Sequence, residues 1–105
     1  MLEDPSTANS AVLTASGVNS VLTTANDIAL VECLGADRTV TLPTAIGNVG
    51  KRIGVKKLDA GNLVQIKTVL NQTIDDVDCT AGSHDLSTQY EWVWLVSDGA
   101  NWWII

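Results

Sequence analysis

The only histidine of the chain, His84, stands between Ser83 and Asp85. A serine, a histidine and an aspartate can together supply a nucleophile, a general base and a group that orients the base. Consecutive residues of an extended segment point to opposite sides, so these three side chains cannot converge on one substrate. We therefore interpret His84 as an exposed loop residue, and we expect that the protein is not an enzyme.

A glycine-containing stretch, Gly47–Arg52, resembles half of a phosphate-binding loop. The complete pattern requires a glycine at the position of Ala45 and a serine or threonine at the position of Arg52. The flanking sequence also lacks the strand and long helix that position such a loop. We expect no nucleotide cofactor here.

Three aspartates lie close together in the sequence, at Asp75, Asp76 and Asp78, and Asp85 follows nearby. Calcium binds several carboxylate oxygens, but an EF-hand loop also needs a glycine and a distal glutamate that this stretch lacks. We interpret the aspartates as a solvated turn and expect no bound metal ion.

The two cysteines, Cys33 and Cys79, are far apart and have no CxxC spacing. With a single histidine in the chain, a zinc site built from one copy is not expected. A disulfide between them is an open alternative, although a reducing compartment disfavours it. We expect two buried thiols.

Four of the six basic residues fall between positions 51 and 57: Lys51, Arg52, Lys56 and Lys57. On a chain of net charge −6 they form a local positive patch that could dock an acidic partner surface. The alternative is a solvated strand edge whose charges prevent edge-to-edge pairing.

The aromatic residues all fall between positions 90 and 103: Tyr90, Trp92, Trp94, Trp102 and Trp103. In a strand, Tyr90, Trp92 and Trp94 share one face, while Val93 and Leu95 share the other, so both faces are apolar. A small sandwich buries only one face of a strand, and tryptophan is enriched at interface hot spots. We expect an oligomer or partner interface that includes Tyr90, Trp92, Trp94 and Trp103. Two alternatives are that the N-terminal segment covers this face, and that the tryptophans bind carbohydrate.

The composition limits the class of protein. A chain of 105 residues is sufficient for one domain, and 17% charged residues beside 46% hydrophobic ones indicate a globular fold. The net charge of −6 disfavours binding to nucleic acid. No apolar run approaches the ~20 residues that span a bilayer, and the polar start MLEDPSTANS does not resemble a signal peptide. We expect synthesis in a cytosol and no membrane contact.

The elements that position these residues are predicted to be strands. Val, Ile and Thr make up 30 of the 105 residues, a bias typical of β-structure. Short alternating segments separated by turns from residue 27 onward predict a small, jelly-roll-like β-sandwich over residues 27–105. Residues 1–26 carry no basic or aromatic residue and repeat Val-Leu-Thr at 12–14 and 21–23. We expect this segment to be an extended arm that contacts a partner through Val12, Leu13, Val21 and Leu22. The predicted core consists of Ile28, Leu30, Val40, Leu42, Ile53, Val55, Val64, Ile66, Val93, Leu95, Trp102 and Ile104.

Several of these segments together resemble a recurrent module of tailed-bacteriophage virion proteins. The resemblance covers about residues 27–105 and is carried by VTLP at 40–43, GKRIGVK at 50–56, GNLVQI at 61–66, QTID at 72–75 and LVSDGANW at 95–102. The last stretch is the most specific. The module occurs in tail-fibre, tail-spike and head-fibre proteins and in small capsid decoration (cement) proteins. Two departures are Trp92 and Trp94 at positions that are usually small and polar, and Asp76 where a turn glycine is common.

The resemblance implies a compact sandwich that assembles as a homotrimer with a structural role and no catalysis. A short chain that starts at Met1 and ends with the last strand of the module is expected to be a decoration protein. Such a protein would be assembled in the host cytoplasm and bind the major capsid protein on the outer capsid surface. A tail, neck or fibre-attachment protein is the first alternative, and a module that binds carbohydrate or a host surface is the second.

Overall fold

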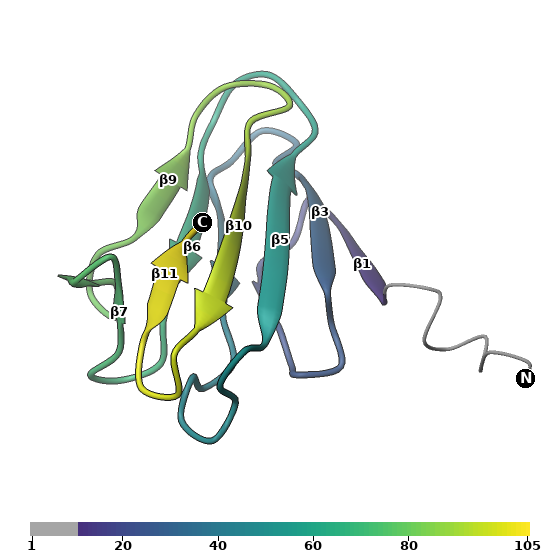
Figure 1. The fold of residues 1–105 in the computed structure, drawn as a ribbon. Coiled ribbons are helices and arrows are strands. Elements are labelled where there is room, and N and C mark those ends of the chain that lie inside the picture. The colour runs from purple at the N-terminus through teal and green to yellow at the C-terminus, as the bar shows by residue number, and fades with distance from the viewer. Residues whose placement is uncertain (1–10) are drawn as a thin grey trace, which may run out of the picture.

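Two β-sheets packed face to face make up the protein, and the computed structural model describes residues 11–105 (Figure 1). The larger sheet has seven strands in the order β1-β3-β5-β10-β11-β7-β8, and the smaller has four in the order β2-β4-β6-β9. The larger sheet contains β1 (Val12–Ser16), β3 (Ile28–Glu32), β5 (Arg52–Lys57), β10 (Trp92–Ser97), β11 (Trp102–Ile104), β7 (Thr73–Ile74) and β8 (Val77–Asp78). The smaller sheet contains β2 (Ser20–Val21), β4 (Arg38–Thr41), β6 (Val64–Lys67) and β9 (His84–Leu86). The predicted all-β sandwich is confirmed.

The chain winds between the two sheets from β1 to β6. Each odd strand joins the larger sheet and each even strand the smaller, and neighbours β1, β3 and β5 are parallel, as are β2, β4 and β6. The three windings are therefore β1 with β2, β3 with β4, and β5 with β6. Both strands of the third winding then pair with an antiparallel strand: β5 pairs with β10, and β6 pairs with β9. A jelly roll consists of antiparallel Greek keys, so the observed connectivity differs from the predicted one.

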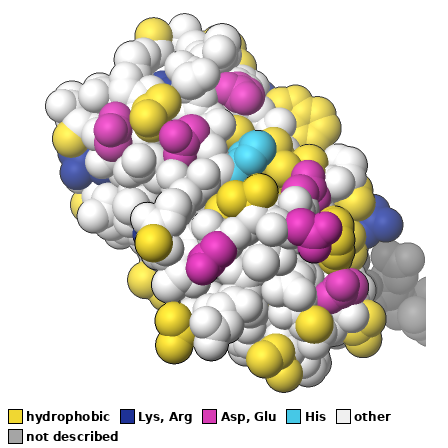
Figure 2. Space-filling model, turned by 90° about the vertical axis from the view of Figure 1, so that its left-hand side faces the viewer, with side chains coloured by type: hydrophobic (Ala, Val, Ile, Leu, Met, Phe, Trp, Pro, Cys, Tyr) yellow, Lys and Arg dark blue, Asp and Glu magenta, His cyan; other side chains and the backbone are white. Residues whose placement is uncertain are grey.

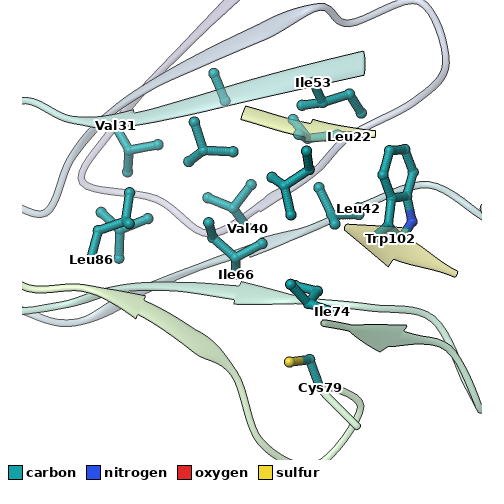
Figure 3. Close-up of a cluster of buried hydrophobic side chains, with 14 of the residues drawn as sticks. Leu22, Val31, Val40, Leu42, Ile53, Ile66, Ile74, Cys79, Leu86 and Trp102 are labelled. Carbon is teal, nitrogen blue, oxygen red and sulfur yellow. The ribbon is translucent and has the colours of Figure 1, made fainter. Parts of the chain in front are cut away.

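The core lies between the sheets and draws on all three windings (Figure 3). Eight of the twelve predicted core residues are at most 1% exposed: Val40, Leu42, Ile53, Val55, Val64, Ile66, Leu95 and Trp102. Val93 and Ile104 are partly buried and pack against this cluster. Each fully buried aliphatic side chain contributes about 1.5–3 kcal/mol, so these positions supply most of the drive to fold.

The side-chain orientation in β3 is opposite to the prediction. Ala29 and Val31 are fully buried, whereas Ile28 and Leu30 point to the outer face of the larger sheet, where they are partly buried. The run IALV is apolar at every position. The sequence therefore does not indicate which alternate side chains of this strand face the core and which face outward.

The predicted arm is wrong for residues 12–22. β1 pairs with β3 and β2 pairs with β4, so this segment forms the first winding of the sandwich, and residues 1–10 lie outside the described residues. The repeated Val-Leu-Thr falls on the two edge strands, and Leu22 is only 2% exposed within the core. Small residues suffice here because an edge strand has to cover only one side of an existing core.

The hairpin between β10 and β11 anchors the larger sheet to the loop that follows β4. Ser97 Oγ donates a hydrogen bond to Ala45 O (2.9 Å) and accepts one from Gly99 N (3.0 Å). Trp102 is fully buried and its Nε1 donates to Pro43 O (3.2 Å). Gly99 has φ of +94°, a backbone conformation that favours glycine. These contacts fix the orientation of β10 and β11, and therefore of their outward side chains.

Candidate functional site

The outer face of the larger sheet carries a row of apolar and aromatic side chains. Strand β10 turns Val93 and Leu95 toward the core and Trp92 and Trp94 outward, and Trp92 is 56% exposed. Neighbouring strands add further apolar side chains to the same face. We call this surface the aromatic face and define it by Val12, Ile28, Leu30, Trp92, Trp94, Val96, Trp103 and Ile105.

Trp94 lies flat against the backbone of β5 because its neighbour there is a glycine. Gly54 pairs with Trp94, and a Cβ added at Gly54 would lie 3.2–3.3 Å from three atoms of the indole. Ile28 pairs with Gly54 from the other side. Because Gly54 has no side chain, the indole of Trp94 lies over β5, between β3 and β10. The surface of the aromatic face is uneven as a result.

Two shallow hollows flank Trp94. One, of about 270 Å³, is lined by Ile28, Leu30, Gly54, Val55, Lys56, Trp92 and Trp94. The other, of about 350 Å³, is lined by Arg52, Trp94 and Ile105. Both are open and predominantly apolar, with one cation each at the rim. Shallow apolar hollows of this kind have the size of single side chains or small apolar groups.

Trp103 is held in place on the same face by a carboxylate from the hairpin. Its Nε1 donates to Asp98 Oδ2 (2.8 Å), while Asp98 Oδ1 accepts from the backbone N–H of Ala100 and Asn101, both at 2.8 Å. The hydrogen bond from Asn101, followed by those from Trp103 and Ala100, lowers the pKa of Asp98 below its ordinary value. The carboxylate therefore stays ionised, with its three donors, to a lower pH than an ordinary aspartate.

The exposed apolar area of this face is comparable to the largest apolar patches on monomeric proteins. Val12, Trp92 and Ile105 are each more than half exposed, as is the neighbouring Tyr90. Since an aromatic side chain presents about 150–250 Å², the face as a whole exposes on the order of 500 Å² of apolar surface. Patches of roughly 300–600 Å² are the largest on typical monomers and are often functional. The exposed apolar side chains thus gather where the tryptophans predicted a partner surface, and the interface itself stays a prediction.

The outer face of the smaller sheet is polar by comparison. Thr39 and Thr41 of β4 point outward there, next to Gln65 and Lys67 of β6 and Asp85 of β9. The inward residues of these strands, such as Val40 and Ile66, are fully buried. The sandwich therefore has one outer face that is compatible with water and one that gains free energy when a partner covers it.

The four basic residues predicted to form a docking patch do not share one surface. Lys57 points inward and is fully buried, where its ammonium donates to Asp59 O, to Gly61 O (2.7 Å) and to Asp59 Oδ1 (3.3 Å). Strand alternation explains this, because Lys57 has the same parity as the core residues of β5. The patch is wrong with respect to Lys57.

The other three basic residues of this stretch have separate environments. Lys51 Nζ forms an ion pair with Asp27 Oδ1 (2.6 Å), and this contact is the main reason that the pKa of Asp27 is lowered. Lys56 points to the aromatic face, 5.6 Å from the ring centroid of Tyr90. Arg52 is exposed beside Trp94. Two cations, Arg52 and Lys56, thus border the aromatic face.

The four residues predicted as contacts of the arm divide between surface and core. Val12 and Val21 are exposed, on the outer sides of β1 and β2. Leu13 packs partly buried against the core and Leu22 is fully buried within it. Only the two valines are available to a partner.

The interpretation of His84 as an exposed loop residue is wrong, because His84 begins strand β9, pairs with Ile66 and is half-buried. Figure 2 shows the side of the molecule that carries the histidine, with carboxylates dispersed over it. Residues 11–105 contain no group of three histidine, cysteine or acidic side chains that could hold a metal ion. The two cysteines are buried free thiols, as predicted, and burial raises the pKa of each. Within the same range no helix is long and apolar enough to cross a membrane.

Reasoning from the sequence missed Gly54, whose lack of a side chain shapes the aromatic face. A glycine inside a strand often marks a close approach of another backbone or side chain, and this was the available signal.

We found no match to this chain among protein families, curated proteins or solved structures.

Proposed function

We propose that this chain is a structural protein of a tailed-bacteriophage virion, a capsid decoration protein that binds the outer capsid surface as a homotrimer. The observation that carries the proposal is the aromatic face, where exposed apolar side chains and three tryptophans gather on one outer face of the sandwich. The resemblance of residues 27–105 to the virion module adds the class of particle. Burial of this face against another protein chain, either a second copy or the major capsid protein, stabilises the assembly.

The mechanism is mechanical. A decoration protein that spans neighbouring shell subunits adds buried area across their junctions, and this offsets the pressure of the packaged DNA. Tryptophans dominate such contacts because they bury a large area with few rotatable bonds. The cations Arg52 and Lys56 at the rim favour a partner surface that carries carboxylates.

The test compares two double variants, one on the outer face of the larger sheet and one on the outer face of the smaller sheet. Trp92→Ala with Trp94→Ala removes the centre of the aromatic face, whereas Thr39→Ala with Gln65→Ala alters the polar face as a matched control. We expect the first pair to lower binding to undecorated particles, or trimer formation, at least tenfold, and the control to leave both unchanged. Circular dichroism establishes that both variants are folded. Unchanged assembly of the tryptophan variant would refute the interface.

The copy number in purified particles distinguishes the location in the virion. Quantitative mass spectrometry against the major capsid protein should give hundreds of copies in a simple ratio to the shell. A handful of copies would instead favour a tail, neck or fibre protein. Absence from particles would remove the virion assignment altogether.

Carbohydrate binding is the second candidate, favoured by the exposure of Trp92 and Tyr90 beside a hollow of about 270 Å³. Aromatic rings stack on the apolar faces of sugars, and glycan-dependent quenching of tryptophan fluorescence would support this function. No quenching across a broad glycan panel would count against it.

A further inference from the structure

The first winding leaves one edge of each sheet open. Among residues 11–105, no strand pairs with the outer edge of β1 or with the outer edge of β2, and both edges lie at the same end of the sandwich. In Figure 1, β1 is the outermost strand of the larger sheet. We call this surface the open edge.

The hydrogen bonds of β1 show which backbone groups the open edge presents. Ile28 N donates to Ala11 O (3.1 Å), and Gly17 N donates to Glu32 O (2.9 Å). Because parallel ladders use alternate residues, the groups that face β3 belong to odd-numbered positions. The N–H and C=O of Val12, Thr14 and Ser16 point away from the sheet, and all three residues are exposed.

The same pattern occurs at β2. Leu22 N donates to Thr41 O (2.8 Å), which directs the backbone groups of Val21 away from β4. The side chain of Val21 is 75% exposed. The two open strands thus present unpaired backbone groups together with exposed valines.

At β1 the open edge lacks the features that prevent strand pairing, whereas β2 has only two residues. Proteins protect edge strands with charge, proline, bulges or short length. The opposite edges follow this rule, since β8 has two residues including Asp78, and β9 has three including His84 and Asp85. Strand β1 has five residues and contains neither a charge nor a proline.

We propose that the open edge pairs with the same edge of a second copy of this chain. A twofold axis through Thr14 would run β1 antiparallel to its counterpart and extend both sheets across the contact. Val12 would then face Ser16 of the second copy, and the two Thr14 residues would face each other, an arrangement without like charges. Cross-strand threonine pairs of this kind stabilise antiparallel ladders.

This contact uses the backbone edge of β1 and shares only Val12 with the aromatic face. A trimer formed through that face would still present three open edges, which could join it to neighbouring trimers. The proposal therefore does not depend on the proposed function, and the purified protein is sufficient to test it.

Residue-resolved amide exchange at several protein concentrations is the primary test. We expect the amides of Val12, Thr14 and Ser16 to become at least tenfold slower to exchange as concentration rises, in parallel with a doubling of mass by sedimentation. The amides of Leu13 and Ala15, which bond within the chain, should not change. Fast exchange at 12, 14 and 16 at every concentration would overturn the proposal. So would slow exchange that is independent of concentration, because the edge would then be covered within one chain.

Variants of Thr14 test the register. Thr14→Pro removes an N–H that has no partner in the sheet and should lower self-association at least tenfold, whereas Thr14→Val keeps the N–H and should preserve it. Thr14→Lys and Thr14→Glu should each weaken association about threefold, and a 1:1 mixture should restore it as a heterodimer. Charge variants that associate as well as the wild type, separately and mixed, would refute the pairing at Thr14 even if the proline variant failed to fold.

Discussion

The buried lysine of β5 gives the most quantitative prediction. Lys57 is fully buried, and its one acidic partner among residues 11–105 is Asp59. The carboxylate of Asp59 also accepts from Cys33 N and Leu34 N, both at 3.0 Å. The carboxylate thus satisfies the ammonium and two backbone donors of the loop after β3. Removal of this one carboxylate leaves the buried ammonium with the carbonyl oxygens of Asp59 and Gly61 as acceptors but without a counter-charge.

The expected free energies follow from this arrangement. Asp59→Asn leaves the Lys57 ammonium without its counter-charge and should destabilise the protein by about 3 kcal/mol, the lower end of the range for breaking a buried pair, because two carbonyl acceptors remain. Lys57→Met removes the charge as well as its hydrogen bonds and should cost only about 1–2 kcal/mol. The double variant should resemble Lys57→Met plus the loss of the two backbone hydrogen bonds, so the two changes should be less than additive by at least ~1 kcal/mol.

The pH dependence adds a second signature. The hydrogen bonds from Cys33 and Leu34 are the main reason that the pKa of Asp59 falls from 3.8 to about 2. Since the pKa is depressed in the folded state, the stabilisation is complete above pH 3.8 and is lost as the pH falls through about 2. The side chain of Asp59 is 23% exposed, and we discount its contribution for screening to about 1–2 kcal/mol. Asp59→Asn should remove this part of the acid sensitivity.

Urea unfolding followed by tryptophan fluorescence measures these quantities, because Trp102 is buried in the folded state. The wild type, the two single variants and the double variant form a thermodynamic cycle, repeated between pH 2 and pH 6. A loss of less than ~0.5 kcal/mol in Asp59→Asn, or strict additivity in the cycle, would refute the account of Lys57.

Three further predictions concern single elements. Asp76 has φ of +68° in the turn between β7 and β8, so Asp76→Gly should stabilise the protein by about 0.5–1 kcal/mol, and an unchanged urea midpoint would contradict this. Ser97→Ala removes the donor to Ala45 O and should cost about 1–3 kcal/mol, visible as a lower melting temperature. Cys33 and Cys79 should resist alkylation until the protein unfolds, because burial raises the pKa of both thiols; rapid labelling of the native protein would disprove their protection.

Local sequence patterns were sufficient for the fold class and for most of the core. Short alternating segments bounded by turn residues predicted a small β-sandwich over residues 27–105, and eight of the twelve predicted core residues are buried. The parity of Trp92 and Trp94 also predicted their outward orientation. Strand alternation is a local property of the chain, and it survives folding wherever polar residues mark one side.

Other features depend on contacts between distant segments. The parallel stacking of the windings joins residues such as Arg38 and Val64, and no local pattern specifies a partner so far along the chain. The buried position of Lys57 was available from parity with Ile53 and Val55, but buried lysines are rare enough that the charge outweighed the alternation. The role of Gly54 depends on Trp94, which is remote in sequence and adjacent in space.

The position of the last strand gives the two ends of the described chain different resistance to force. The chain enters through β1, which is bonded on one side only, so tension applied at Ala11 opens a single ladder, bond by bond, at low force. Strand β11 lies inside the larger sheet between β10 and β7, and Trp102 anchors it in the core. Tension applied at that end must shear two ladders and extract an indole at the same time. A force that strains this protein would therefore open the first winding before the rest, and β11 would be among the last elements to yield.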